Sequence, residues 1–351
     1  MFAADEKKMV NKEDIIKEKK EKLRLFLLCL VPILLFIISF SLGRYPVTPK
    51  ELITVLCSKL WSISHSLPEE IETVIFQIRL PRILAAMVIG SALATSGCAY
   101  QGMLKNPLVS PDILGASAGA GFGAALGIHL SFSIVGIQIS SFFFGLAAVL
   151  LAYLVSGKMR NDPILGLVLS GILLGTLFSA GTSFIKFIAD PYDKLPAITF
   201  WLMGSLASIS IADLTIAFIP IIIGLIPLFL VRWRLNVMTM GEEEAKSLGI
   251  NTTVLRIVVI LSSTLITTAA VCISGLIGWV GLVVPHLARM LVGPNYNILL
   301  PASILIGCSY LLIVDNLARL LTTVEVPLGI LTSLVGAPFF LYLIMRNRRI
   351  G

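Results

Sequence analysis

Three arginines stand where they could bind carboxylates. Arg79 and Arg82 flank the start of one long apolar run, and Arg319 ends another. Arginine keeps its charge, and its planar guanidinium group can hold a carboxylate through two parallel hydrogen bonds. The three residues therefore predict docking of an acidic partner. Two other interpretations remain open: membrane anchors at helix ends, and an internal pair between Arg319 and Asp315, four residues earlier on the same helical face.

A short acidic segment later in the chain could bind a second partner. Gly241 can cap a short helix, the three glutamates from Glu242 lie in its first turn near the positive end of the helix dipole, and Gly249 can end it. Ala245 and Leu248, three residues apart, are expected to share one small apolar face. Such a helix suits docking into a groove of another protein. A plain solvated loop is the alternative.

One histidine falls inside an apolar run. His286 follows Pro285, and an intramembrane histidine can hold a proton or a metal ion. No second ligand lies near it in the sequence, so a hydrogen-bonded structural histidine is favoured. The five cysteines form no CxxC pair and predict neither a disulfide framework nor a metal site. We expect no metal and no cofactor.

Catalytic and ATP-binding motifs are absent from the sequence. It contains no G-x-x-x-x-G-K-[ST] stretch and no Ser/His/Asp or His/Glu cluster with catalytic spacing. The chain is therefore not expected to be an enzyme, and any energy that it uses must come from a partner.

The elements that position these residues are long apolar runs. Hydrophobic residues make up 57% of the 351 residues, charged residues 13%, and the mean hydropathy is +0.95. A helix needs about 20 apolar residues to cross a bilayer, and the backbone can be satisfied there only within helices or closed barrels. We therefore expect an all-α integral membrane protein with ten spans, at 25–43, 81–104, 113–129, 134–156, 163–189, 211–231, 254–274, 276–291, 300–320 and 328–345.

Basic residues orient these spans. With ten spans and the first residues inside, most of the 27 Lys and Arg residues fall on the cytoplasmic side, so both termini are expected there. The chain then divides into a charged cytoplasmic segment at 1–24, whose lysines can meet anionic lipid, a transmembrane domain at 25–346 and a tail at 347–351. The most polar stretch of the domain, 232–253, contains the acidic segment.

Two patterns mark places where helices break or touch. Asn106 and Pro107 predict a helix-breaking turn, for which structural and gating roles are equally open. Glycines recur every fourth residue at Gly115, Gly119 and Gly123, and Gly171, Gly175 and Ser179 repeat the pattern. Such small-residue stripes let helix backbones approach closely, so packing is the favoured explanation.

Several stretches are too specific for packing alone. They are Ile78–Arg82, Asn106–Gly115, Gly241–Gly249, Gly278–His286 with Arg289, Asp315–Arg319 and Glu325–Gly329. Together, over roughly residues 40 to 345, the chain resembles the permease family of ferric-siderophore, haem and vitamin B12 ABC importers.

The resemblance implies partners and roles for individual residues. It implies a ten-helix subunit, similar to the vitamin B12 permease, that works as a dimer in the cell membrane with two ATPase subunits inside and a binding protein outside. Arg79, Arg82 and Arg319 would receive acidic residues of the binding protein, and the Gly241–Gly249 segment would couple to the ATPase.

The resemblance also implies a pathway. The fifth span, with Ser170, Gly171 and Leu174, would line the channel, and the loop before it, Asn161 and Asp162 here, would form the cytoplasmic gate. The vitamin B12 permease has small hydroxyl residues at that loop, so the chemistry of the seal differs in this chain.

Other functions and substrates are weighed against this interpretation. A secondary transporter or channel would need ionisable residues inside the bilayer, and mid-span positions are nearly free of charge. A membrane enzyme would need a catalytic cluster. The substrate implied is an iron chelate, with cobalamin, molybdate or tungstate as alternatives, and no nucleic acid. Whether the dimer contains two identical chains or two paralogues stays open, with identical chains favoured.

Overall fold

The computed structural model describes residues 2–43, 45–61, 67–158 and 163–347, and all regular structure in these ranges is helical. The helices are α1 (Phe2–Ser41), α2 (Pro49–Trp61), α3 (Glu69–Thr73), η1 (Val74–Arg79), α4 (Leu80–Met103), η2 (Pro111–Leu114), α5 (Ala116–His129), α6 (Ile134–Ser156), α7 (Pro163–Ile188), α8 (Lys194–Met203), α9 (Ile211–Met240), α10 (Glu242–Ser247), α11 (Thr252–Ser274), α12 (Val280–Val292), α13 (Tyr296–Leu320) and α14 (Leu328–Asn347).

Each of the ten expected spans coincides with one of these helices. Seven helices of the described chain are long and apolar enough to cross a membrane. Three of the spans are shorter: α5 has 14 residues, α12 has 13, and the apolar part of α14 is Leu328–Tyr342. The short helices leave irregular backbone at 275–279 and around Gly115, which a membrane protein tolerates only where other protein segments or a water-filled cavity cover it.

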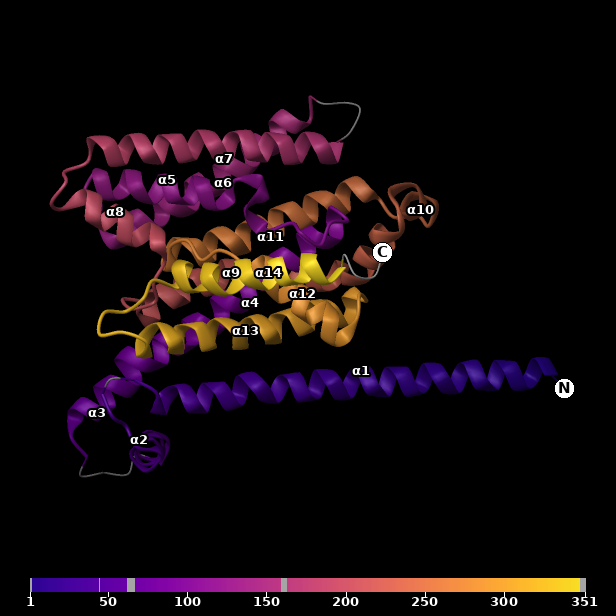
Figure 1. Ribbon diagram of the computed structural model, residues 1–351, viewed down its shortest axis with the longest axis horizontal. Helices are drawn as coiled ribbons and strands as arrows, with labels where there is room; N and C mark the ends of the chain where they lie inside the picture. Colours follow the sequence, from indigo (N-terminus) through magenta and orange to yellow (C-terminus); the bar gives the residue numbers. More distant parts are fainter. Residues whose placement is uncertain (1, 44, 62–66, 159–162, 348–351) are drawn as a thin grey trace.

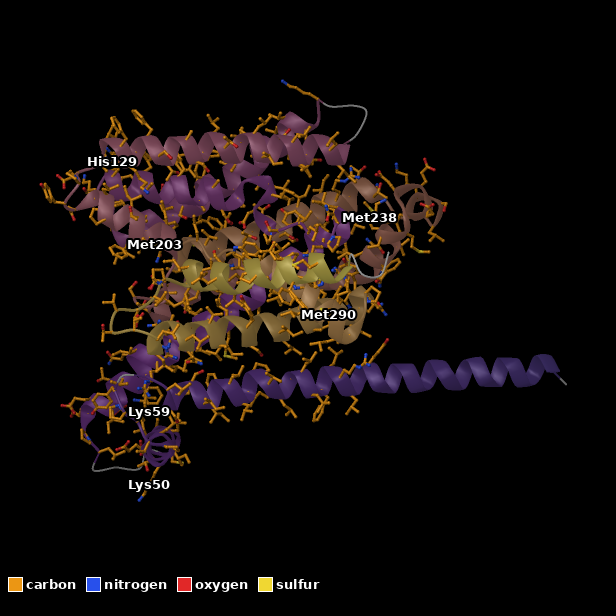
Figure 2. The ribbon with its side chains drawn as sticks, in the orientation of Figure 1. Lys50, Lys59, His129, Met203, Met238 and Met290 are labelled. Carbon is orange, nitrogen blue, oxygen red and sulfur yellow. The ribbon has the colours of Figure 1, made fainter. Side chains whose placement is uncertain are left out.

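The helices run roughly parallel in one bundle, and its two ends differ (Figure 1). The first residues of α1, the end of α14 and α10 lie at one end, whereas α2 and α3 lie at the other. We call the end with α2 and α3 the outer end and the end with α10 the inner end, following the orientation expected from the sequence. Lys50 and Lys59 of α2 mark the outer end, and Met238 of α9 lies near the inner end (Figure 2).

Two helices form the centre of the bundle. In both α4 and α11, 78% of the most apolar window is buried, compared with 17% in α1 and 22% in α7. The peripheral helices thus leave large apolar side chains on the surface, as expected of a chain solvated by lipid.

The central helix α4 touches its neighbours backbone to backbone. A Cβ atom built on Gly90 would lie 2.2 Å from the carbonyl oxygen of Gly307 in α13, and one built on Gly97 would lie 1.8 Å from that of Gly281 in α12. No side chain fits at either contact. These close approaches explain why glycine occupies two positions seven residues apart in α4.

The small-residue stripes of the fifth-span and third-span sequences also pack helices together. A Cβ on Gly119 or Gly123 would collide with α6 backbone oxygens at 2.5 and 2.4 Å. On the other side, Gly171 of α7 lies against Ile113, whose oxygen would be 2.4 Å from an added Cβ. The packing interpretation is confirmed for Gly119, Gly123 and Gly171, whereas Ser179, the last residue of the second stripe, is exposed.

Several expected boundaries were wrong, each for a local reason. The second span begins not at Pro81 but at Glu69, because α3, η1 and α4 form one continuous 35-residue helix. Pro81 has no N–H to donate, and the turn before it widens so that the Leu80 N–H bonds to the Ile75 carbonyl, five residues back.

The polar stretch at 232–253 is also more helical than expected. Helix α9 continues to Met240, nine residues past the expected end of the span. Val231, Leu235 and Met238 are buried at helical spacing, so one apolar stripe keeps the extension packed against the bundle. The segment before Leu25 is likewise helical, since α1 is continuous from Phe2 to Ser41.

Candidate docking and coupling sites

Arg82 lies at the centre of a cluster of charged side chains at the outer end. Its Nε and Nη2 atoms each lie 2.9 Å from Oδ1 of Asp315, and its Nη1 atom lies 2.8 Å from Oε1 of Glu325. The side chain of Asp315 is fully buried and that of Arg82 is 6% exposed. Helix α4 supplies the arginine, α13 the aspartate and the α13–α14 connection the glutamate, so the cluster joins three segments.

Arg319 and Arg79 complete this cluster. The Nε atom of Arg319 lies 3.3 Å from Oδ2 of Asp315, close enough for an ion pair but not aligned for a hydrogen bond, and its other nitrogens donate to Asn316 and to the Leu42 carbonyl. Arg79 donates to the carbonyls of Phe40 and Tyr45. The outer cluster, as we name Arg79, Arg82, Asp315, Arg319 and Glu325, therefore also ties α1 to the bundle.

The burial of the three arginines differs from the surface position expected of docking residues. Arg79, Arg82 and Arg319 are 3%, 5% and 7% exposed, so none presents a free guanidinium group in this conformation. For Arg82 and Arg319 the physical reason is the pair of carboxylates, because charges can be buried when they are paired and hydrogen-bonded, and Arg79 is held by backbone carbonyls instead. The alternative that Arg319 pairs internally with Asp315 is confirmed. The role of these arginines in docking stays a prediction.

Helix α10, at the inner end, is fixed by its C-terminal turn. The Gly249 N–H bonds to the Lys246 carbonyl and the Ile250 N–H to the Ala245 carbonyl, the two bonds of a Schellman motif. Gly249 has φ +79°, which a residue without Cβ adopts at little cost. Ala245 and Ile250 are both buried, as the hydrophobic contact of that motif requires.

The expected apolar face of this helix was wrong in one respect. Ala245 is fully buried against the bundle, whereas Leu248 is 65% exposed. The two residues point to different sides because α10 is only six residues long and Leu248 already lies in its C-terminal cap. Leu248 and the 71% exposed Met240 are therefore the apolar side chains that this segment offers to the cytoplasm.

Glu242 connects α10 to the start of α11. Its carboxylate lies 3.1 Å from Nη2 of Arg256, 3.2 Å from Nζ of Lys246 and 3.1 Å from the Thr252 hydroxyl. Partial burial opposes ionisation, but the hydrogen bond from Lys246 and the charge of Arg256 hold the pKa of Glu242 below its usual range. Glu243 and Glu244 are both exposed, and the Glu244 carboxylate lies over the backbone of Gly241.

The proposed pathway helix, α7, has one covered face and one open face. Ser170 and Gly171 are buried against η2, and Leu174 is half-buried. Asn161 and Asp162, the expected gate, lie outside the described residues. On the open face, Thr176, Ser179 and Ser183 are exposed.

The open face of α7 is divided along its length. The hydroxyl residues share one side of it with the exposed Leu165 and Ile172, and the exposed Leu173, Leu177 and Phe184 lie on the other. The face is thus mainly apolar with hydroxyl groups along one side, and it is free of charged side chains from Ile164 to Ile185.

Two sequence motifs have structural explanations. The Asn106 side chain accepts a hydrogen bond from the Leu108 N–H at 2.9 Å, which closes a turn around Pro107 after α4. His286, one residue after Pro285 in α12, packs on Phe339 and Phe340, with ring centroids 6.2 and 5.9 Å away. Its buried Nδ1 atom has no hydrogen-bond partner among the described residues. The expected hydrogen bond is therefore absent at this nitrogen, and the ring packs on aromatic side chains.

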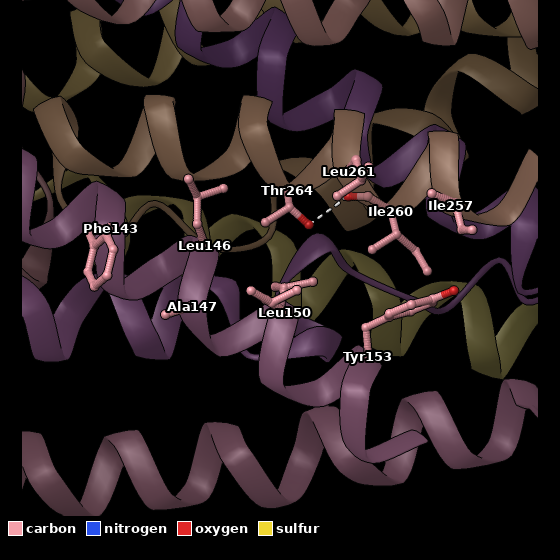
Figure 3. A pocket seen from close by; sticks show the side chains of 10 residues that line it. Phe143, Leu146, Ala147, Leu150, Tyr153, Ile257, Ile260, Leu261 and Thr264 are labelled. Carbon is pink, nitrogen blue, oxygen red and sulfur yellow. Dashed lines mark hydrogen bonds between the residues drawn. The ribbon is translucent and has the colours of Figure 1, made fainter. Parts of the chain in front are cut away.

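An apolar crevice of about 360 Å³ lies between α6 and α11 (Figure 3). Leucine, isoleucine and phenylalanine side chains line it, and the hydroxyl of Thr264 is bonded to the carbonyl of Ile260 in its own helix at 2.6 Å. The crevice offers little to a polar or charged solute. Across the described residues, no group of three or more His, Cys, Asp or Glu side chains is placed to hold a metal ion.

Comparisons with known proteins agree with this arrangement. Residues 29–346 match the model of the FecCD transport family. The chain is 42% identical to the molybdate import system permease MolB of Haemophilus influenzae over 93% of this chain and 96% of that one. It is 36% identical to the Fe(3+)-citrate import system permease YfmE of Bacillus subtilis over 95% of this chain and 98% of that one.

A solved structure has the same fold. It is described as an inward-facing conformation of a metal-chelate type ABC transporter, and one of its chains superposes with a TM-score of 0.82 at 42% identity, covering 92% of this chain and 98% of that one.

Proposed function

The chain belongs to the FecCD transport family, and on that premise we propose that it conducts an iron chelate, a ferric siderophore or haem, across the cell membrane as one half of a dimeric permease. As an ABC importer permease it is a multi-pass membrane protein and not an ATPase. The family implies an ATPase subunit and a binding protein as partners.

The open face of α7 is the observation that supports a chelate. A ferric chelate presents apolar flanks and oxygen atoms around a shielded metal, and a face that sets Thr176 and Ser183 beside Leu173 and Leu177 matches both. Because no charged side chain lies along most of this helix, the solute would pass without being held tightly. The gate at its inner end is assigned to Asn161 and Asp162 on the strength of the resemblance.

Molybdate or tungstate is the second candidate. The relative that supports it, MolB, aligns with nearly the whole chain. Against it stands the same α7 face, since a small divalent anion is best stabilised by arginine, lysine or backbone N–H groups. Cobalamin remains a further alternative, because its size and mixed polarity also suit this face.

The partners would meet opposite ends of the bundle. We assign the ATPase subunit to α10, with Leu248 and Met240 entering its groove, and the binding protein to the outer cluster. A second, identical copy would complete the channel, because one subunit presents only one open α7 face. The lysines of residues 1–24 would meet anionic lipid or the ATPase.

Uptake by proteoliposomes tests the proposal. The permease, its ATPase subunit and the cognate binding protein are reconstituted together, and ATP-dependent uptake of a radiolabelled ferric chelate is compared with that of radiolabelled molybdate. Uptake of the chelate alone supports the first candidate, uptake of molybdate alone the second. Crosslinking of the active complex tests the dimer, and a monomer with full activity would contradict it.

A replacement of Thr176 separates the pathway assignment from the rest. Thr176→Arg puts a charge on the open face without touching buried residues, so it is expected to reduce chelate uptake while the ATPase still co-purifies. The matched control is Leu151→Arg on α6, which is 43% exposed on another helix. Equal losses in both variants would argue against a pathway role for α7.

A further inference from the structure

Glu325 occupies the position that a docking carboxylate would need. The guanidinium group of Arg82 gives Nε and Nη2 to Asp315, and its remaining nitrogen, Nη1, gives its bond to Glu325. An acidic side chain arriving from outside therefore finds no free edge on Arg82. One of the two existing carboxylates must leave first.

The two carboxylates are held very differently. Asp315 projects from helix α13, is fully buried and is shared by Arg82 and Arg319. Glu325 lies in the irregular connection 321–327, its side chain is 33% exposed, and its second oxygen, Oε2, has no hydrogen-bond partner in the described chain. Glu325 is thus the carboxylate that can be exchanged, since its release breaks one bonded contact and frees a buried oxygen that has no hydrogen-bond partner among the described residues.

The charge balance of the outer cluster favours an incoming anion. Among the described residues, three arginines face two carboxylates, and Arg79 is bonded only to backbone carbonyls. The cluster therefore has a formal charge of +1 even with Glu325 in place. An acidic side chain of a partner protein would therefore approach a site with a net positive charge.

We propose that Glu325 is an internal substitute for a carboxylate of the binding protein, and that docking displaces it from Arg82. The inference rests on the proposed function, because it takes an acidic binding protein as the partner of the outer end. Docking is then an exchange of one ion pair for another. The free energy of docking then includes only the difference between the lost Arg82–Glu325 contact and the new contact with the partner. Because these contacts are similar, the binding protein can dissociate in each transport cycle.

The test is Glu325→Gln in the full complex with its ATPase subunits in nanodiscs. The amide is nearly isosteric but binds a guanidinium group more weakly than a carboxylate does, so the dissociation constant of the cognate binding protein is expected to fall about tenfold, mainly through faster association. Glu70→Gln is the matched control, since Glu70 is an exposed residue at the same end and loses the same charge. It should change the affinity less than twofold.

A second variant protects the test against misfolding. Glu325→Asp keeps the charge but shortens the side chain, so it should give an intermediate increase in affinity. An unchanged dissociation constant in Glu325→Gln, or a change equal to that of Glu70→Gln, would overturn the exchange while leaving the proposed function intact. Failure of the binding protein to dock on the parent complex would instead contradict the proposed partner, and the exchange with it.

Discussion

The two ends of the bundle treat their charges in opposite ways. At the outer end, Arg82 and Asp315 are buried and join helices far apart in the sequence. At the inner end, Glu243 is exposed to solvent, the Glu244 carboxylate lies over the Gly241 backbone, and Glu242 meets Arg256. The outer charges therefore stabilise the fold, and they can bind a partner only if their internal bonds break. The inner segment, in contrast, is already exposed to a partner.

The largest expected effect concerns the buried aspartate. Asp315→Asn removes the carboxylate that Arg82 and Arg319 share, leaving two buried cations with only Glu325 between them. Breaking a buried pair in this way costs about 3–5 kcal/mol. We expect a clear loss of thermal stability in detergent, measured by the unfolding of the purified subunit. An unchanged unfolding temperature would show that the outer cluster does not hold the fold.

The inner end should separate folding from coupling, because its two apolar residues point to different sides. Ala245→Asp buries a new carboxylate against the bundle, and a cost of roughly 1–3 kcal/mol or more is expected, seen as faster proteolysis of the α9–α11 connection. Leu248→Asp should leave this connection intact and instead prevent co-purification of the ATPase subunit. The opposite pattern would mean that the helix docks through its other side.

Acid should loosen the inner segment. The pKa of Glu242 lies below its ordinary value of 4.5 in the folded chain, so its stabilising contribution is complete above pH 4.5 and is lost as the pH falls through the lower folded value. The protection of amides 242–252 against exchange, relative to the intrinsic rate at each pH, should therefore fall below pH 4.5. In Glu242→Gln the exchange should already be fast at neutral pH, and pH-independent protection in the parent would contradict this account.

The smallest effect is expected at an exposed glutamate. Glu243→Gln removes a solvated charge without a bonded partner of its own, so stability should change by less than about 0.5 kcal/mol and coupled transport should continue. ATP hydrolysis and uptake, measured side by side, provide the check. A large loss of coupling would place Glu243 in the ATPase interface.

Local patterns predicted the helices well. A run of about twenty apolar residues can do little else in a membrane, so all ten expected spans correspond to helices. The extension of α9 could have been found from the spacing of Val231, Leu235 and Met238, which the polar residues between them concealed. The wide turn before Pro81 depends on how the whole helix is packed and leaves no simple trace in the sequence.

The outer cluster was harder to predict because its contacts are not local. The pair of Asp315 and Arg319 follows from a spacing of four residues on one helix. The bond between Arg82 and the same aspartate spans 233 positions, and Glu325 reaches the pair from an irregular segment. Residue type alone suggested surface arginines, whereas burial depends on counter-charges that only the folded chain brings together.

The glycine contacts of α4 have a mechanical consequence. Where Gly97 meets Gly281 and Gly90 meets Gly307, backbone lies directly on backbone with no flexible side chain between them. Sliding α4 past α12 or α13 would drive peptide groups into one another, so these three helices should translate and rotate together as one rigid block. Any rocking that opens and closes the channel must then occur at joints elsewhere, where side chains separate the helices and can change rotamer.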